Sequence, residues 1–188
     1  STHMKDEFEQ KYPGNPVSVV PFFPSPSICS KAHRTPNFVY ISNGNPHKNH
    51  SRLLEAWQQV HKTYPDVSLF LTVDRLKYPS LAEQIDRLEK CNVRNLGLIS
   101  KEQVCQLLGK NLYLIYPSLA ESFGLVLIEA VTNEIKVIAA DLPYVNSVIE
   151  PSLSFDPYCE KSIADAVIIT LSTELNTSQI RTKNQIKD

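Results

Sequence analysis

LYLIYPSLAESFGLVLIEAV, residues 112–131, joins one apolar run to another through a short polar loop. The first run, from Leu112 to Tyr116, predicts a buried parallel strand, and a proline ends it. A helical pattern begins near Gly124, and a single carboxylate, Glu129, interrupts it. Apolar residues surround Glu129 in this pattern, which is typical of a buried helix. An acid buried there needs hydrogen-bond donors from the chain or from a ligand, because leaving it unpaired costs roughly several kcal/mol.

The loop of this strand-loop-helix unit indicates what kind of ligand would fit. Open α/β sheets bind ligands at the carboxyl ends of their strands, where this loop lies. The amides of Gly124, Leu125 and Val126 would start the helix without partners, and such amides favour phosphate. Gly124 lacks a β-carbon, so a ligand can approach its backbone closely. Glu129, about one turn further along the helix, would accept hydrogen bonds from a sugar ring.

Strands and helices alternate along the rest of the chain. Short apolar runs predict strands at residues 38–42, 67–73, 95–98, 112–116, 137–140 and 153–155. Apolar residues at helical spacing predict helices at residues 50–64, 80–90, 101–108, 124–133 and 161–171. This alternation predicts a Rossmann-like α/β fold, a doubly wound parallel sheet with right-handed crossovers and a site at its carboxyl edge.

Three blocks of the sequence resemble family 4 retaining glycosyltransferases, and their order along the chain fits that family. The central block is residues 115–130, in which seven residues separate the two glutamates Glu121 and Glu129. Residues 39–57 resemble the first strand, diphosphate loop and first helix of that family's nucleotide-sugar domain. Residues 137–145 and 155–157 match its closing strand and the start of the next helix. The resemblance implies a GT-B enzyme, in which two Rossmann-like domains hold the acceptor and the sugar nucleotide on either side of a cleft.

The resemblance also divides the chain. Residues 1–4 resemble a tag remnant, and residues 5–36 would be the tail of a missing N-terminal domain and its linker. Residues 37–175 would be the nucleotide-sugar-binding domain, followed by a polar C-terminal tail at residues 176–188. A length of 188 residues suits one core of this kind. The expected fold is therefore the C-terminal half of a GT-B glycosyltransferase.

Two catalytic residues follow from the resemblance. Lys48 would reach the donor's diphosphate as a positive charge and help the sugar leave without a metal ion. Glu121 would contact hydroxyls of the donor sugar near the reacting carbon. Both have ordinary alternatives, since most lysines are solvated and a carboxylate at a helix start is favoured by the helix dipole.

The remaining donor contacts are expected in three loops and one helix. Asn43 stands where many relatives carry an arginine, and an amide offers hydrogen bonds without charge. Glu129 would bind the ribose of the donor, or else be satisfied by protein donors. Ser122 has an alternative as a helix cap and Phe123 as a packed aromatic. The expected donor-binding set is Asn43, Gly44, Leu98, Ile99, Ser122, Phe123, Gly124, Leu125 and Glu129.

Composition narrows the class of protein. The chain carries 19 basic and 20 acidic residues and shows no nucleic-acid footprint. No apolar run approaches the ~20 residues that span a bilayer. The four cysteines lack metal-ligand or disulfide spacing, which favours a reducing compartment. His47 and His50 have no companion ligands, so they are expected to be surface or capping histidines, and no metal site or cofactor is predicted.

These observations lead to one hypothesis and one alternative. The hypothesis is a donor-binding domain of a retaining glycosyltransferase, taking a nucleoside-diphosphate sugar and serving a sugar or lipid-linked acceptor held by the missing domain. The product would be polysaccharide or lipopolysaccharide, made in the cytoplasm or at the inner membrane face, and the isolated domain would be inactive. The alternative is a non-catalytic binding or scaffold module with a degenerate donor site. Ser147, where many relatives have glutamate, and residues 133–136, which lack the usual glycine and proline, favour that alternative.

Overall fold

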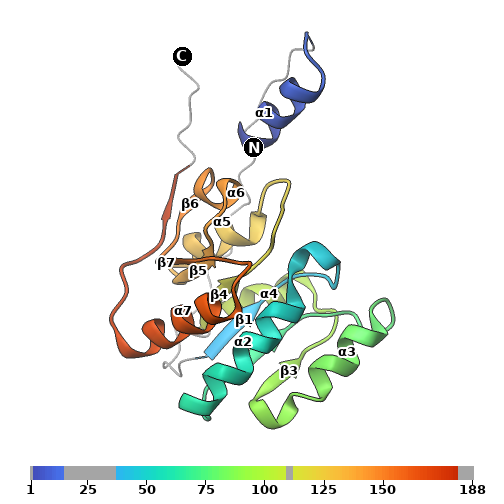
Figure 1. The fold of residues 1–188 in the computed structure, drawn as a ribbon, viewed down its shortest axis with the longest axis vertical. Coiled ribbons are helices and arrows are strands. Elements are labelled where there is room, and N and C mark those ends of the chain that lie inside the picture. Colours follow the sequence, from blue (N-terminus) through green and yellow to red (C-terminus); the bar gives the residue numbers. More distant parts are fainter. Residues whose placement is uncertain (1, 15–36, 109–111, 182–188) are drawn as a thin grey trace.

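A parallel β-sheet forms the centre of the molecule, in a computed structural model that describes residues 2–14, 37–108 and 112–181 (Figure 1). Its six strands lie in the order β3-β2-β1-β4-β5-β7, and every neighbouring pair is parallel. The order reverses between β1 and β4, so their carboxyl ends form the topological switch point. The strands are β1 Asn37–Tyr40, β2 Leu69–Leu71, β3 Val93–Asn95, β4 Leu112–Tyr116, β5 Val137–Ala140 and β7 Leu153–Phe155.

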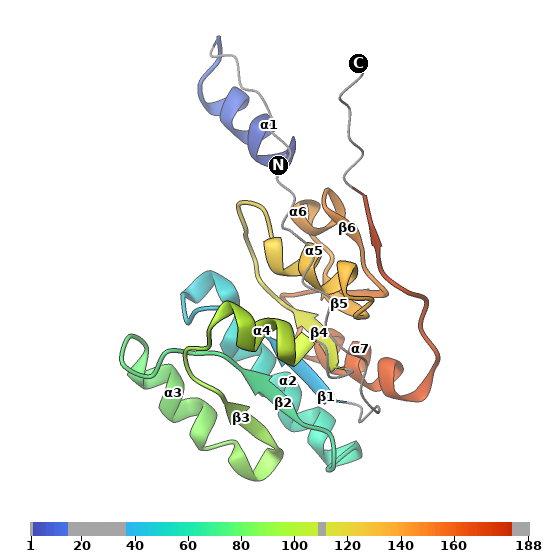
Figure 2. The ribbon, with the colours of Figure 1, turned by 180° about the vertical axis from the view of Figure 1, so that it is seen from behind.

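Helices cover both faces of this sheet, which confirms the predicted doubly wound fold. Helices α2 and α7 lie against one face (Figure 1), and α4 and α5 lie against the other (Figure 2). The longer helices are α1 Thr2–Lys11, α2 His50–Thr63, α3 Pro79–Asp86, α4 Lys101–Leu108, α5 Leu125–Thr132 and α7 Glu160–Ser172. Shorter turns are η1 Pro46–Lys48, η2 Glu89–Cys91 and α6 Pro143–Asn146.

The core lies between these layers. Every residue of β5 is buried, as expected for a strand covered on both faces. Trp57 on α2 packs edge-on against Phe38 of β1, with ring centroids 5.6 Å apart, and its indole N–H donates to the carbonyl of Cys91. Helix α2 is thereby fixed over the first strand. Within the described ranges, no helix has the length and apolar character needed to cross a membrane.

The third strand begins and ends earlier than the predicted 95–98. Asn95 is the last residue of β3, and its side-chain amide exchanges two hydrogen bonds with the backbone of Val73. Leu96 and Leu98, whose apolar side chains suggested a strand, are exposed. Residues 96–99 therefore form a loop at the sheet's carboxyl edge.

Two short strands were not predicted. They are β6 Ile149–Glu150 and β8 Gln179–Ile180, and they pair in an antiparallel ladder. The chain after α7, expected to be a polar tail from residue 176, thus runs back along the domain (Figure 2). Most of the expected linker, residues 15–36, lies outside the described residues.

Candidate active site

Hydrogen bonds join the two loops that leave the sheet at the switch point. The side-chain amide of Asn49 donates to the carbonyls of Pro117 and Pro157, at 3.1 and 2.8 Å. The amide of Leu119 donates to the carbonyl of His47 at 2.7 Å. Asn49 adopts a left-handed backbone with φ of 61°, a conformation that asparagine tolerates. The loops after β1 and β4 therefore form one block.

A buried ion pair lies inside this block. Nζ of Lys48 is 2.5 Å from Oε1 of Glu121, and the two side chains are only 11% and 12% exposed. The hydroxyl of Tyr116 donates to the same Oε1 at 2.9 Å, and the hydroxyl of Tyr40 donates to the Lys48 carbonyl at 2.9 Å. Lys48 is thus not a solvated loop lysine, and Glu121 precedes the helix rather than occupying its first turn.

Neutral donors surround the pair. Burial raises the pKa values of Tyr40, Tyr116 and Tyr144 above their ordinary value, and the negative charge of Glu121 raises them further. These hydroxyls consequently keep their protons at neutral pH. The hydroxyl of Tyr144 donates a hydrogen bond to the carbonyl of Ser118 at 2.6 Å, which further fixes the β4–α5 loop.

His50 is not the surface or capping histidine that the sequence suggested. It is 4% exposed, because it starts α2 directly over β1, where its ring lies 5.1 Å from that of Tyr40. Its Nε2 lies 3.2 Å from the Ser42 hydroxyl, whereas its buried Nδ1 has no partner among the described residues. Burial, and then the charge of Lys48, lower its pKa to about 4. His47 is exposed.

A cavity of about 580 Å³ opens over the ion pair at the carboxyl edge of the sheet. Its walls come from the loops after β1, β2, β3 and β4. Nine of the eleven residues singled out in the sequence line it: Asn43, Lys48, Leu98, Ile99, Glu121, Ser122, Phe123, Gly124 and Leu125.

Gly44 lines a neighbouring cavity of about 410 Å³ instead. A β-carbon at this position would lie 2.5 Å from Cγ of Tyr78, so the glycine is required by the close approach of that ring. The Tyr78 hydroxyl bonds to the side-chain oxygen of Asn45 at 2.7 Å. Lys77 and Tyr78 line both cavities and separate them.

Helix α5 starts at the cavity wall. Gly124 is its N-cap, with φ of 70° and ψ of 46°, a left-handed conformation that glycine adopts without strain. Ser122 is therefore not the helix cap that was considered for it. The first-turn amides of an α-helix have no partners within the helix, and the helix dipole makes this end positive. The wall can accordingly accept an anion.

Glu129 is not the deeply buried acid that the pattern predicted. Its side chain is half-buried, it does not line the cavity, and its carboxylate has no hydrogen-bond partner among the described residues. Only one face of α5, with Leu127 and Ile128, packs onto the sheet, while Leu125 on the opposite side is 38% exposed. The short apolar run is thus a partly exposed helix.

Sequence reasoning missed the residues that follow β2. Asp74, Lys77 and Tyr78 all line the larger cavity. Asp74 organises this turn, since its carboxylate accepts hydrogen bonds from the amides of Leu76 and Lys77. The exposed Lys77 adds a second positive charge at the cavity. The sequence showed only that these residues follow a strand. This position indicates a place at the cavity once β2 is known to lie beside β1.

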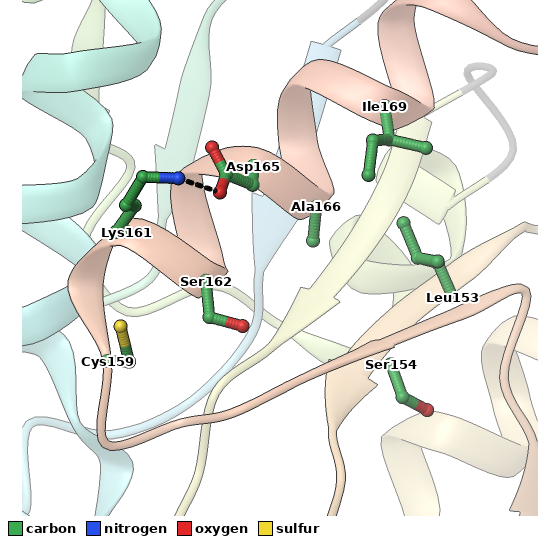
Figure 3. A pocket seen from close by; sticks show the side chains of 8 residues that line it. All are labelled: Leu153, Ser154, Cys159, Lys161, Ser162, Asp165, Ala166 and Ile169. Atoms are coloured by element: carbon green, nitrogen blue, oxygen red, sulfur yellow. Dashed lines mark hydrogen bonds and ion pairs between the residues drawn. The ribbon is translucent and has the colours of Figure 1, made fainter.

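Figure 3 shows a different cavity, of about 280 Å³, between β7 and α7. Its one charged pair, Lys161 and Asp165, lies 2.6 Å apart on the exposed surface of the helix. It contains none of the residues expected from the sequence and lies at the sheet edge. Within the described residues, no group of three or more histidines, cysteines, aspartates or glutamates could hold a metal ion. The switch-point cavity is therefore the candidate active site.

Fold and site together define the class of protein: a Rossmann-like domain like the C-terminal domain of GT-B glycosyltransferases. The family model "Glycosyl transferases group 1" matches residues 28–188, so the chain belongs to this family.

Two relatives with curated functions are mannosyltransferases. The serotype-specific mannosyltransferase WbdA of Escherichia coli is 28% identical over 153 residues, which are 79% of this chain and 19% of WbdA. The O-antigen chain mannosyltransferase RfbU of Salmonella typhimurium is 30% identical over 144 residues, which are 74% of this chain and 40% of RfbU. The chain thus spans between about a fifth and two fifths of these relatives.

Solved structures share the fold. A mutant of S. aureus TarM, in complex with fondaparinux, alpha-GlcNAc-glycerol and UDP, has a TM-score of 0.76 at 18% identity, covering 92% of this chain and 36% of that one. Anabaena HepE, in complex with UDP and glucose, has a TM-score of 0.60 at 24% identity, covering 72% of this chain and 38% of that one.

Proposed function

We propose that this chain binds a nucleoside-diphosphate sugar and forms the donor side of a retaining glycosyltransferase that builds polysaccharide or lipopolysaccharide. One observation carries the proposal: Lys48, Glu121 and the start of α5 meet in a single cavity at the switch point. The mannosyltransferase relatives support the sugar chemistry, and the UDP complexes of two structural neighbours support a nucleotide ligand.

Positive charge in the cavity suits the diphosphate. An ammonium group has three N–H donors, so Lys48 can keep its bond to Glu121 and still donate to a phosphate oxygen. The amides of Leu125 and Val126 provide further donors at the positive end of α5. In this proposal, these groups take the place of a metal ion and stabilise the negative charge of the departing diphosphate.

Glu121 faces the sugar in the proposed reaction. An acceptor hydroxyl attacks the carbon that carries the diphosphate, on the face from which the diphosphate leaves. The acceptor's proton passes to the leaving phosphate, so the reaction needs no nucleophile from this chain. The acceptor itself, a sugar or a lipid-linked sugar, would be held by a domain outside this chain. The loop at Leu98 and Ile99 lies across the cavity and would hold the nucleobase.

The alternative of a non-catalytic module rests on the charge balance of the same cavity. Glu121 already neutralises Lys48, and the exposed Asn43 uses its side-chain oxygen to cap the amide of Asn45. A cavity with so little net positive charge would bind a diphosphate weakly. The donor-binding domain should bind nucleotides, whereas the non-catalytic module should not, so nucleotide binding distinguishes the two functions.

Calorimetric titration of this chain with UDP, GDP, ADP and their sugars tests the proposal. Wild type should bind one nucleoside diphosphate, and Lys48→Ala should weaken its binding by roughly tenfold or more, because a charge-assisted hydrogen bond is lost. Lys90→Ala is the matched control, since Lys90 is an exposed lysine on η2 away from the cavity.

Removing Lys48 leaves Glu121 without its ion-pair partner, which threatens folding. The double variant Lys48→Ala/Glu121→Gln avoids this, and circular dichroism checks that each variant is folded. Failure of every nucleotide to bind the wild-type chain would refute the proposal and favour the scaffold module.

A further inference from the structure

Tyr116 ends β4 and lines the cavity, and its hydroxyl points to the carboxylate that the proposed reaction uses. Oε1 of Glu121 accepts two hydrogen bonds, one from Lys48 and one from Tyr116. No described residue bonds to the other oxygen, Oε2, although Glu121 lines the cavity. The carboxylate is therefore held by one oxygen, and the second is available to a ligand.

The position of the Tyr116 ring is fixed. Its side chain is 3% exposed and meets Tyr40 edge-on, with ring centroids 5.5 Å apart and an interplanar angle of 84°. Tyr40 in turn bonds to the backbone of Lys48. Each partner of the ion pair is thus held by its own buried tyrosine.

The two donors to Oε1 differ in how they respond to a bound diphosphate. Lys48 carries charge and three N–H donors, so it can share these donors between Glu121 and a phosphate. Tyr116 is neutral, and its single O–H group already donates a hydrogen bond to Glu121. Tyr116 can therefore keep the carboxylate in place while Lys48 also binds the diphosphate.

We propose that Tyr116 is a positioning residue for the transferred sugar: by occupying Oε1 of Glu121 it holds Oε2 toward the cavity, where a hydroxyl of the sugar donates to it. This inference rests on the proposed function and deepens it. It separates recognition of the sugar, through Tyr116 and Glu121, from recognition of the diphosphate, through Lys48 and α5. Although Tyr116 lines the cavity, its role in this proposal is exerted through Glu121.

Tyr116→Phe tests the inference, because it keeps the ring and removes one hydroxyl. The measured quantity is the sugar increment, defined as the affinity for a nucleotide sugar divided by the affinity for the same nucleotide without its sugar. Calorimetry on the full chain would compare UDP with UDP-glucose and UDP-N-acetylglucosamine, GDP with GDP-mannose, and ADP with ADP-glucose. Tyr116→Phe should leave the affinity for the nucleoside diphosphate within about twofold of wild type and lower the sugar increment roughly fivefold to tenfold.

Two further variants show that the effect passes through Glu121. In a Glu121→Ala background, Tyr116→Phe should have no additional effect on the sugar increment, since the group that it positions is gone. Tyr113→Phe is the matched control: Tyr113 lies on the same strand, stacks on Phe38 and does not line the cavity. It should leave both affinities unchanged.

The outcomes separate this inference from the proposed function. A wild-type chain that binds no nucleotide refutes both. A wild-type chain that binds nucleotide, with an unchanged sugar increment in Tyr116→Phe, refutes the inference alone. Equal losses of nucleotide and nucleotide-sugar affinity in Tyr116→Phe would also refute it, because they indicate a general loss of structure.

Discussion

Uncharged residues determine how the charged residues of the cavity are arranged. Burying Lys48 and Glu121 costs solvation, which their attraction offsets only when good hydrogen bonds complete the pair. Tyr116 provides such a bond to the carboxylate, and Tyr40 fixes the backbone of the lysine. The sequence indicated both charged residues and their places beside the cavity. It did not indicate that they pair with each other, because 73 positions separate them.

The buried His50 makes stability depend on pH. Its pKa falls from an ordinary 6.5 to about 4, so between these values the unfolded chain binds a proton that the folded chain does not. The free energy of unfolding should therefore decrease as the pH falls from 6.5 to 4, by up to about 1.4 kcal/mol per pH unit. Urea unfolding at several pH values measures this slope.

His50→Gln should flatten that slope relative to wild type, whereas His47→Gln, at an exposed position, should leave it unchanged. An equal slope in wild type and His50→Gln would contradict the assignment of a neutral, buried imidazole at this position.

Short elements were predicted well where their signal is local and poorly where it depends on neighbours. The strand at Leu112–Tyr116 and the helix after Gly124 have strong local patterns, and both are present. The third strand was displaced because the apolar residues after Asn95 are exposed in a loop. Glu129 was misjudged for a related reason, since periodicity shows which residues are apolar but not which face of α5 another element covers.

Gly124 fixes where α5 begins, and its left-handed backbone makes it sensitive to substitution. Gly124→Ala should lower the free energy of unfolding by about 1–2 kcal/mol, the cost of a β-carbon in this conformation. The new β-carbon would also lie 3.0 Å from Cδ1 of Leu127. Urea denaturation measures the loss.

Gly124→Asn is the informative comparison, because asparagine tolerates the left-handed region. It should be less destabilising than Gly124→Ala. Equal losses in the two variants would assign the effect to the contact with Leu127 rather than to the backbone, and no loss in either would contradict the argument.

At the scale of the whole molecule, the segment after α7 connects the start of β5 with the turn before β7. The hydroxyl of Ser178 accepts hydrogen bonds from the amides of Val137 and Ser152, at 2.9 and 3.0 Å. Ser178→Ala leaves the amide of the buried Val137 unpaired, whereas the amide of Ser152 keeps its bond to the Val137 carbonyl. The variant should lower the free energy of unfolding by about 1–3 kcal/mol. Ser172→Ala, which alters an exposed serine at the end of α7, should change it by less than about 0.5 kcal/mol. Thermal and urea unfolding of both variants check this, and equal effects would show that residues 178–181 contribute little.

The sequence by itself determined the alternation of strands and helices and the loops that carry Lys48, Glu121 and Gly124. These features depend on hydrophobic period and local backbone preference, which neighbouring residues are enough to express. Only the tertiary structure decided that Lys48 pairs with Glu121, that Tyr116 shares the same oxygen, that Lys77 and Tyr78 join the cavity, and that Glu129 lies outside it. Such contacts join residues distant in the chain, and they exist only because the sheet places β1, β2 and β4 side by side.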